Sequence, residues 1–416
     1  MLCQFSVKNY KSFKDEATLD FQATNITDHE NEIIVDNNDG AKYLPLASIY
    51  GPNGSGKSNV LSALNSLLVK IMRPICAACD KNDCSEKNKK KPNIVPFRFD
   101  IISINEPTEF EIFFRSKKAE YKYVLHVKED IVIYESLSKL NFNSSKEIKL
   151  FYKDTNLSKQ IWLNKTYFKN INVSGISESL PILSYLGITN KDIDVIKDVL
   201  RWLEGGIETV NYGNPYTEAR ILLIKGNFKK EMLIKMLKEA DIDIDGYRTE
   251  EKDEEIKVFT KHIVDDYEQE LSLADESNGT VKLFALLPMI IDSIKRGTTL
   301  VVDELDAKLH PKLLEYIIEL YRNPSKNKKG AQLVFTSHDL MTMTAELFRR
   351  DEIWFVAKNN EQASKLYSLV EFKKENGKAP RKDEKYGKQY LEGRYGADPY
   401  FKRMINWEDQ NGGEES

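Results

Sequence analysis

Short apolar runs alternate along this chain with longer segments in which apolar residues recur at helical spacing. The run Leu44–Tyr50 is followed, after a glycine-rich turn, by a helical pattern over Asn59–Val69. Two more runs, Thr299–Val302 and Gln332–Phe335, are short and mostly apolar. Continuous runs of this length are typical of strands that are buried on both faces of a parallel sheet. The pattern therefore predicts an α/β core.

A different pattern, with alternating apolar and polar residues, lies between these core runs. It covers Glu109–Phe114, Glu120–Val127 and Ile131–Leu140, and the last two are joined by the turn-like Lys128-Glu129-Asp130. Alternation with a short connection predicts antiparallel strands. Leu2, Phe5 and Val7 alternate in the same way at the start of the chain. We therefore expect an antiparallel β-lobe beside the core.

From about Pro181 to Ala240 the apolar spacing becomes helical, as in Ile193, Ile196, Leu200 and Leu203. We expect four parts: residues 1–72 and 271–416 form the two halves of the core, residues 73–150 form the β-lobe with a cysteine-containing loop, and residues 151–270 form a mainly helical insert. No apolar heptads are sustained through the insert, so we expect no long coiled coil.

Composition places the chain among ordinary soluble proteins, with 41% hydrophobic and 30% charged residues in 416. No run approaches the roughly 18 apolar residues of a membrane span, and the start of the chain has no signal-peptide pattern. We therefore expect a cytoplasmic protein without a membrane partner. The net charge of −4 gives no general attraction to nucleic acid, so a DNA contact would need a local patch. The run Lys87–Lys91 is more typical of a solvated loop.

The glycine-rich turn, Gly51-Pro-Asn-Gly-Ser-Gly-Lys-Ser58, is a complete phosphate-binding loop between a strand and a helix. Its glycines let backbone N–H groups face phosphates, and the following helix adds its positive N-terminal dipole. Lys57 would contact the β- and γ-phosphates and Ser58 would bind Mg²⁺. We expect the nucleotide to be held by a contiguous set of residues: Asn53, Gly54, Ser55, Gly56, Lys57, Ser58 and Asn59.

Two carboxylates directly follow the strand Thr299–Val302. At the carboxyl end of such a strand Asp303 would hold Mg²⁺, and Glu304 would polarise the attacking water. The phosphate loop and this acidic pair together predict a nucleotide hydrolase that uses ATP and Mg²⁺.

Further segments resemble the ATP-binding-cassette ATPases, specifically the branch of RecF and the heads of chromosome-maintenance ATPases. Ser277-Asn278-Gly279-Thr280 resembles a shortened signature motif, Leu305-Asp306 a D-loop, and Thr336-Ser337-His338-Asp339 a switch histidine. The resemblance implies that Ser277 and Gly279 complete the site of a second, head-to-tail subunit. It also implies that Asp306 lies at the nucleotide and that His338 senses the γ-phosphate.

The opening Lys8–Phe13 resembles the first turn of RecF-like heads, which implies that Lys11 and Ser12 lie near the nucleotide. One departure concerns the glutamine that normally contacts Mg²⁺ in this family. There is no glutamine between Gln22 and Gln160, so this contact stays unassigned.

Three of the four cysteines cluster as Cys76, Cys79 and Cys84. A cytoplasmic location argues against a disulfide framework. Zinc would need a fourth ligand, from Cys3 or a second subunit, because no histidine lies nearby in sequence. We favour a loop without metal over a zinc site.

The last hundred residues, with Arg349–Val356, Lys365–Leu369 and Tyr390–Gly396, resemble compact AAA-type ATPases of phage-defence systems. These are the AbiLi and RloA proteins and, more distantly, the PARIS ATPase AriA and the OLD nucleases. Because 78 residues follow His338, we expect no nuclease domain after the ATPase core.

The resemblance therefore implies an ATP-hydrolysing regulatory subunit of an abortive-infection system. We expect it to form homo-oligomers, to answer a phage-derived trigger and to control a separate nuclease or toxin effector. A RecF-like DNA-repair ATPase and an ATP-dependent assembly scaffold remain as alternatives.

Overall fold

The computed structural model describes residues 1–78, 91–142, 146–157, 160–210, 223, 229–252, 255–373, 380–381 and 384–396. Its centre is a six-stranded sheet in the order β11-β15-β16-β5-β17-β18, in which every pairing is parallel except that of β17 with β18. The strands expected from the apolar runs are confirmed as β5, β15 and β16. The bounds are β5 (Leu46–Tyr50), β11 (Ile207–Val210), β15 (Thr299–Val302), β16 (Gln332–Thr336), β17 (Ile353–Lys358) and β18 (Ser364–Ser368).

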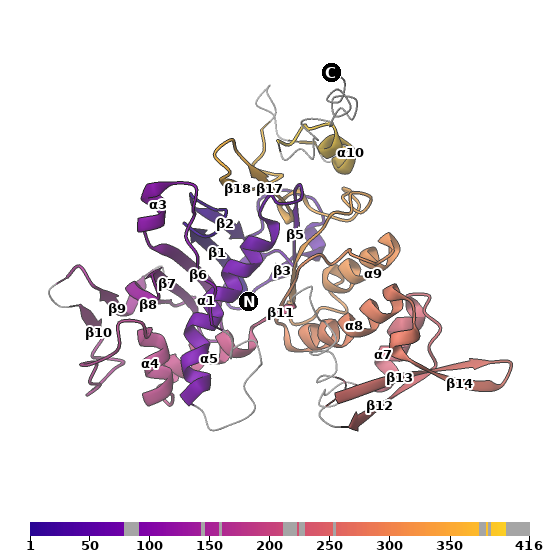
Figure 1. The fold of residues 1–416 in the computed structure, drawn as a ribbon, viewed down its shortest axis with the longest axis horizontal. Helices are drawn as coiled ribbons and strands as arrows, with labels where there is room; N and C mark the ends of the chain where they lie inside the picture. The colour runs from indigo at the N-terminus through magenta and orange to yellow at the C-terminus, as the bar shows by residue number, and fades with distance from the viewer. Residues whose placement is uncertain are drawn as a thin grey trace, which may run out of the picture.

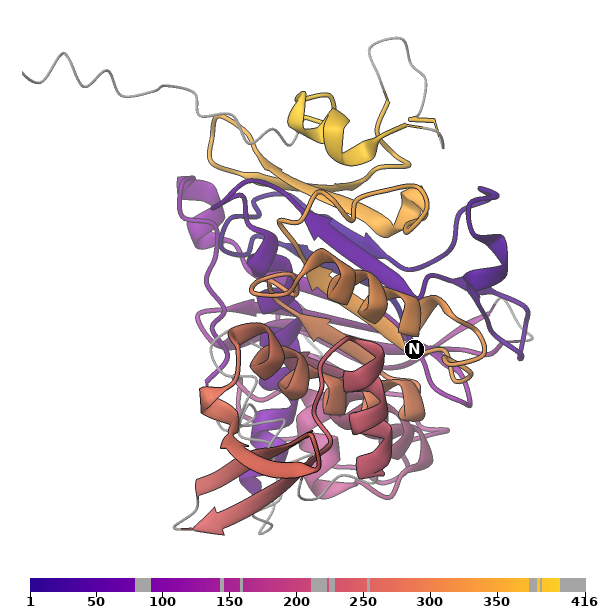
Figure 2. The ribbon, with the colours of Figure 1, turned by 90° about the vertical axis from the view of Figure 1, so that its right-hand side faces the viewer.

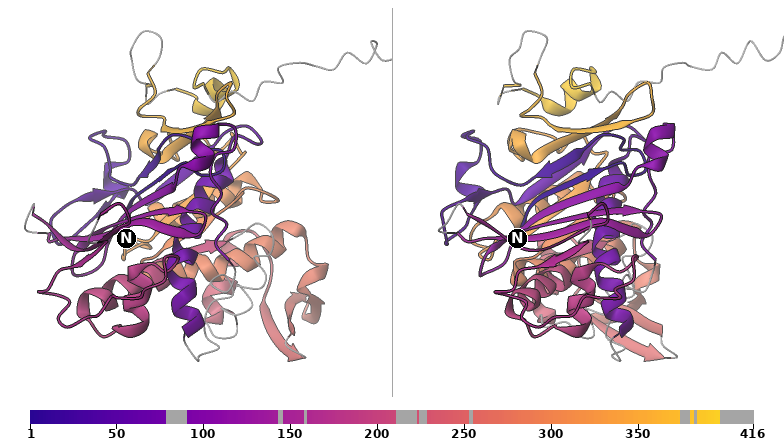
Figure 3. Two further views of the ribbon diagram at one scale, coloured as in Figure 1. Left: turned by 60° about the vertical axis from the view of Figure 1, so that its left-hand side comes forward. Right: turned by 90° about the vertical axis from the view of Figure 1, so that its left-hand side faces the viewer.

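A seven-stranded antiparallel sheet, the lobe sheet, lies beside this core sheet, as Figures 1 and 3 show. The alternating segments are confirmed as its strands, and Glu129 and Asp130 at the expected turn have positive φ angles of 50° and 71°. The order is β10-β9-β8-β7-β6-β1-β2. The bounds are β1 (Leu2–Lys8), β2 (Ala17–Asp20), β6 (Thr108–Arg115), β7 (Glu120–Lys128), β8 (Ile131–Leu140), β9 (Glu147–Asp154) and β10 (Ile161–Leu163).

The core sheet is buried on both faces because its strands point alternate side chains to two hydrophobic clusters. Ala47 and Ile49 face the cluster that contains the lobe sheet, α1 (Lys57–Ala78), α4 (Ile182–Thr189) and α5 (Asp194–Gly205). Leu46 and Tyr50 face the cluster of α7 (Lys230–Glu239), α8 (Asn278–Arg296) and α9 (Pro311–Arg322). By length and composition α1 could cross a membrane, but 61% of its apolar window is buried inside the protein.

The insert at residues 151–270 differs from the mainly helical expectation. It holds α4, α5 and α7, but also β10, β11 and a three-stranded antiparallel sheet, β12-β13-β14. That sheet consists of β12 (Gly246–Lys252), β13 (Glu255–Val264) and β14 (Tyr267–Ser272), and it projects at the end of the molecule opposite α10 (Tyr386–Leu391), as Figure 2 shows. Its strands are rich in charged residues and β14 is mostly exposed, so they lack the apolar alternation that predicts a strand. Part of the insert, including residues 211–222, lies outside the described residues.

Small elements complete the fold: the hairpin β3 (Ile34–Val35) and β4 (Lys42–Tyr43), and the short helix α3 (Ile101–Asn105) before β6. The longest helix in the described part of the chain is α1, with 22 residues. A long coiled coil is therefore absent from the described ranges.

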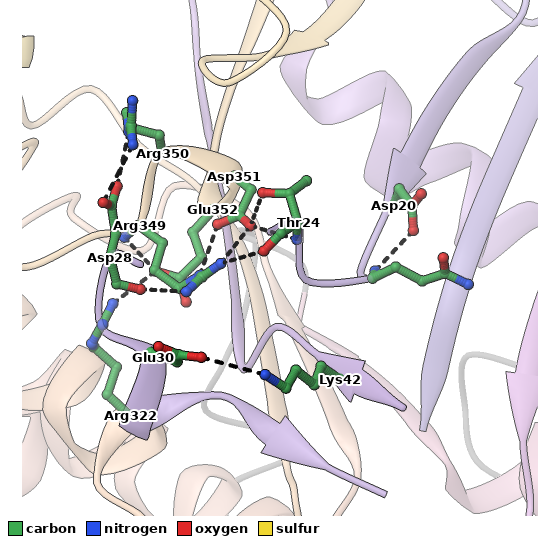
Figure 4. A network of polar contacts seen from close by, with 11 residues as sticks. Asp20, Thr24, Asp28, Glu30, Lys42, Arg322, Arg349, Arg350, Asp351 and Glu352 are labelled. Carbon is green, nitrogen blue, oxygen red and sulfur yellow. Dashed lines mark hydrogen bonds and ion pairs between the residues drawn. The ribbon is translucent and has the colours of Figure 1, made fainter. Parts of the chain in front are cut away.

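A buried polar network connects the N-terminal segment to the end of the core, as Figure 4 shows. Arg322 is 1% exposed and donates to Glu352, which is fully buried, and to Glu32. Arg349 donates to Asp351, and Asp351 accepts from Thr24. Burial raises the pKa of Glu352, and Arg322 opposes that shift. The stability of this network therefore depends on the pairing of opposite charges that are buried away from solvent.

We expect Arg322→Met to lower the free energy of unfolding by about 3–5 kcal/mol, because it leaves the buried carboxylate of Glu352 uncompensated. Urea denaturation measures this loss. Arg394→Met is the control: Arg394 pairs with Glu392 at the surface, and its loss should change stability by less than about 0.5 kcal/mol. Arg322→Met combined with Glu352→Gln should be more stable than Arg322→Met alone. Equal stability of the two would contradict this account.

Candidate nucleotide site at the carboxyl edge of the core sheet

The phosphate loop runs from the end of β5 into α1, and its glycines are required by close contacts. A Cβ at Gly56 would lie 2.5 Å from Ser12 Oγ and 2.6 Å from Ser364 Oγ, and Gly56 has a φ of +111°. A Cβ at Gly51 would collide with the carbonyl oxygen of Val356. Both positions exclude every larger residue, so the loop is closed tightly around the start of α1.

Lys57 is buried in this loop, with 6% of its surface exposed. Its Nζ donates to the carbonyl oxygens of Gly51 (2.8 Å) and Pro52 (3.1 Å). Burial lowers the pKa of Lys57, while the carboxylates of Asp303 and Glu304 oppose that shift. Within the described residues its ammonium has no carboxylate partner at ion-pair distance. A buried cation that is bonded only to neutral carbonyls fits an anionic ligand such as a phosphate.

Asp303 lies at the end of β15 beside the first turn of α1. Its Oδ1 accepts from Ser58 Oγ at 3.0 Å and from Thr336 Oγ1 at 2.6 Å. Thr336 stands at the end of β16, the parallel neighbour of β15, so the carboxyl ends of both strands meet here. Hydroxyl and carboxylate oxygens are ligands that suit Mg²⁺. The residues present therefore fit a nucleoside triphosphate with its magnesium ion.

Glu304 has a positive φ of 50°, an uncommon conformation for this residue type. Its backbone N–H donates to Thr336 Oγ1 at 2.7 Å, and its carbonyl oxygen accepts from Lys282 Nζ at 2.7 Å. Lys282 also donates to Ala307 O at 2.7 Å. Burial lowers the pKa of Lys282 to about 8, against the raising effect of Asp306 and Glu304. Contacts from two elements thus hold Glu304 in a strained backbone conformation, as is common at functional sites.

We expect Lys282→Met to slow hydrolysis by about tenfold, equivalent to about 1.4 kcal/mol of barrier, and to leave ATP binding unchanged. The reason is that the Glu304 backbone loses a contact which holds its conformation. Single-turnover hydrolysis and a binding titration separate the two effects. Lys312→Met, which removes a surface pair with Glu315, is the control. A weakened binding with unchanged single-turnover rate would contradict this role.

His338 and Asp306 are in contact near the carboxyl ends of β16 and β15, respectively. The backbone N–H of His338 donates to Asp306 Oδ2 at 3.0 Å, and the His338 side chain is exposed. The other carboxylate oxygen of Asp306 is buried and has no hydrogen-bond partner among the described residues, as is also true of Tyr50 OH. The expected D-loop and switch segments are therefore in contact with each other in one chain.

Ser277 and Gly279 form the first turn of α8. Ser277 is the N-cap residue, and its Oγ accepts from the Thr280 N–H at 3.1 Å. A Cβ at Gly279 would lie 3.2 Å from the carbonyl oxygen of Lys308. In the described part of the chain, no hydrogen bond or ion pair joins either residue to its own phosphate loop. Ser277 is exposed, so its hydroxyl is open to a second molecule.

The opening turn of the chain lies at the phosphate loop through Ser12 rather than Lys11. Asn59 Nδ2 donates to Ser12 Oγ at 2.8 Å, whereas Lys11 Nζ donates to Ser62 Oγ at 2.7 Å, farther along α1. Asn53 and Gly54 are exposed at the tip of the loop, and Ser55 is buried beneath it.

Three contributors to the site were not among the expected site residues: Thr336, Lys282 and Ser364. Ser364 Oγ donates to Ser55 O at 2.5 Å from the edge strand β18, more than 300 positions away in sequence. Thr336 is the last residue of β16 and the first residue of the expected switch segment, and Lys282 follows the expected signature on α8, so both had a positional signal. Ser364 had no such signal.

The cysteines give no metal site in the part of the chain that is described. Cys3 is buried and Cys76 is partly buried, while Cys79 and Cys84 lie outside the described residues. No group of three or more potential metal-ligating side chains occurs among the described residues.

Comparison with known proteins gives one family and a set of matches among solved structures. The family described as "AAA domain, putative AbiEii toxin, Type IV TA system" matches residues 46–343. No curated protein matches the chain. Among solved structures, the SMC head domain from Thermotoga maritima is 14% identical, covers 88% of this chain and 98% of its own, and has a TM-score of 0.40. An SmcHead bound to the C-winged helix domain of ScpA is 13% identical, covers 88% of this chain and 97% of its own, and has a TM-score of 0.39.

Proposed function

This chain belongs to the family of AAA domains described as putative AbiEii toxin of type IV toxin–antitoxin systems, and on that premise we propose that it is the ATP-hydrolysing regulatory subunit of a two-component antiphage system. The observation that carries the ATPase activity is the joint geometry of Lys57, Ser58 and Asp303 at one sheet edge. The observation that favours a regulatory role is the description of the matched family, which places it in a toxin–antitoxin context.

The placement of the residues supports the following proposed roles. ATP would supply the phosphoryl group that is transferred to water, and Mg²⁺ would neutralise charge that develops on the phosphates. Lys57 would exchange its loop carbonyls for phosphate oxygens, and Ser58 with Asp303 would hold the metal. Glu304, fixed through its backbone, would orient and polarise the attacking water, and His338 would contact the γ-phosphate from the adjacent strand end.

We further propose that two copies share each site. Neither Ser277 nor Gly279 forms a hydrogen bond with its own phosphate loop in the described part of the chain, and Ser277 is exposed while Gly279 is partly exposed, so a second copy can contact this turn. In a head-to-tail pair the first turn of α8 from one copy would cover the phosphate loop of the other. Its N-terminal dipole and hydroxyl would then face the phosphates.

Ser277→Arg should abolish ATP-dependent assembly, because a bulky cation would occupy the interface where a small hydroxyl must approach the phosphate of the partner. Sedimentation velocity with and without ATP measures the assembly. Lys295→Glu, at the other end of α8, is the control and should assemble normally. ATP-dependent oligomers of unchanged size together with full hydrolysis in Ser277→Arg would contradict the shared site.

The partner of this ATPase would be a separate nuclease or toxin effector, restrained or released by the ATP cycle in response to a phage-derived trigger in the cytoplasm. We propose that this chain is an ATPase of the AbiLi and RloA type. We propose the insert around Pro181–Ala240 and the segment Tyr386–Tyr400 as the surfaces for the effector; residues 211–222, 224–228 and 397–400 of these segments lie outside the described ranges. A RecF-like clamp would instead need a basic surface for DNA, and no described feature favours one.

Co-purification with the product of the adjacent gene, with and without ATP, tests this function. We expect a stable complex whose composition changes with ATP, and toxicity in cells only when both genes and the trigger are present. The chain alone should be harmless. Nuclease activity of the purified chain with Mg²⁺ or Mn²⁺ would contradict the two-component assignment, and tight ATP-dependent binding to DNA ends without a protein partner would favour the RecF-like alternative.

A further inference from the structure

A cluster of large apolar side chains is exposed on and beside α3. Phe99 is 70% exposed, Ile101 81%, Ile102 71% and Ile104 46%. We call these four residues the α3 patch. Single apolar residues at a surface are ordinary, but a group this dense within six positions is typical of an interaction site.

A second apolar surface is exposed on the hairpin β13–β14. Val264 is 66% exposed, Tyr267 69% and Leu271 39%. Val264 pairs with Tyr267, and Leu271 pairs with Thr260, so the three side chains lie on one face of the sheet. We call them the hairpin face.

The hairpin face lies on the same side of the β12–β14 sheet as residues that pack against α8. Thr260 pairs with Tyr247 on β12, and the ring of Tyr247 contacts Phe284 of α8 with the ring centroids 5.4 Å apart. Toward the tip of the hairpin the same face leaves α8 and becomes exposed. An apolar face that begins in the core and continues into solvent is incomplete in the single chain.

Both surfaces are connected to the elements that form the shared site. Val95, a few residues before the α3 patch, accepts from the Lys11 N–H at 2.7 Å, next to Ser12 at the phosphate loop. The hairpin contacts Glu276, the residue before Ser277. Glu276 Oε1 accepts a hydrogen bond from Thr260 Oγ1 at 2.6 Å and lies 2.8 Å from His262 Nε2. The segment before the α3 patch thus contacts the opening turn that lies at the phosphate loop, and the hairpin contacts the residue before the signature turn.

The order of these elements across the molecule decides which surfaces can meet. In Figure 1, α3, α1, α8 and the β13–β14 hairpin follow one another from left to right. In a two-fold pair that places the start of α8 against the start of α1 from the other copy, the order of the second copy is reversed. In such a pair α3 of one copy, which lies beyond α1, contacts the hairpin of the other copy, which lies beyond α8.

The charges beside the two surfaces are complementary. Arg98, next to the α3 patch, is exposed, and Asp265 and Asp266 at the hairpin tip are exposed as well. None of the three forms an ion pair within the described residues. A cation beside one apolar surface and two carboxylates beside the other fit a single interface.

We propose that the α3 patch of one copy docks on the hairpin face of a second copy and so stabilises the ATP-bound pair. This inference rests on the proposed head-to-tail pairing and adds the contact that holds it beside the nucleotide. The hairpin face would therefore bind a second copy of this chain. An effector or DNA at the hairpin would contradict it.

Substitutions on the two surfaces, measured by sedimentation equilibrium with ATP in a Glu304→Gln background, test this contact. Tyr267→Ser and Phe99→Ser should each weaken the pair by at least about tenfold. Ile263→Ser is the matched control, because Ile263 is 46% exposed on the opposite face of the same hairpin, and it should leave the pair unchanged. Arg98→Glu should weaken the pair, and adding Asp265→Lys with Asp266→Lys should restore it.

A disulfide gives a second readout. Copies with Ile102→Cys and copies with Tyr267→Cys, in a chain with Cys76, Cys79 and Cys84 changed to Ser, should cross-link when mixed with ATP, and neither should cross-link alone. If the pair forms in ATP but tolerates Tyr267→Ser and Phe99→Ser and gives no cross-link, the docking contact is wrong and the shared site stands. If the unchanged protein forms no pair in ATP, the shared site fails and the docking contact fails with it.

Discussion

Glu304→Gln should slow ATP hydrolysis by at least about a hundredfold while ATP remains bound, because the change removes the group that polarises water and leaves the phosphate contacts intact. The side chain keeps its size, and the backbone contacts of Glu304 with Thr336 and Lys282 do not involve the carboxylate. The structure at the loop should therefore be unchanged. Steady-state phosphate release and a binding titration measure the two quantities.

The trapped state gives a further consequence of Glu304→Gln. If ATP joins two copies, slow hydrolysis should make the oligomer persist, which size-exclusion chromatography in ATP can detect. Glu315→Gln, on the exposed side of α9, is the control and should behave as the unchanged protein. Hydrolysis near the unchanged rate in Glu304→Gln would mean that another group activates the water.

Lys57→Ala should weaken ATP binding by at least about a hundredfold, because charge-assisted contacts of one ammonium with phosphates contribute roughly 3 kcal/mol. Lys57 is the buried cation at the loop, and its partners in the described chain are neutral carbonyls. Equilibrium binding of a fluorescent ATP analogue measures the loss. Lys11→Ala is a matched comparison, since the ammonium of Lys11 contacts Ser62 and not the loop.

Loss of Lys57 could also loosen the loop itself, since its ammonium bonds to Gly51 and Pro52. Thermal unfolding separates the two effects: a melting temperature close to that of the unchanged protein, together with lost binding, indicates a direct phosphate contact. Retained binding in Lys57→Ala would contradict the assignment of the phosphate loop.

Local sequence was sufficient where one segment carries both the element and its chemistry. Leu46–Tyr50, the phosphate loop and α1 are contiguous, so apolar spacing and glycines predicted them together. The pair Asp303 and Glu304 was placed by the short strand before it. These features depend on neighbours along the chain, and periodicity detects such neighbours.

Sequence was insufficient where the site is built from distant strands or from exposed ones. Ser364 reaches Ser55 only because β18 joins β17 at the edge of the core sheet, and a lone serine in an edge strand has no pattern. Thr336 acts through the parallel register of β15 and β16, which sets which residues end together. The sheet β12–β14 was missed because its charged strands bury few apolar residues.

A mixing experiment tests most directly whether each nucleotide site is formed by residues from two copies. Lys57→Ala and Ser277→Ala should each hydrolyse ATP much more slowly alone, since one lacks the phosphate contact and the other the signature contact, and neither change adds bulk to the interface. In a mixed head-to-tail pair, one site combines the intact Lys57 of the second variant with the intact Ser277 of the first. We predict that mixing restores hydrolysis to at least about tenfold above either variant alone, whereas mixing Lys57→Ala with Glu304→Gln restores none. Absence of recovery from the first mixture, with both variants folded, would contradict a site that is shared between two copies.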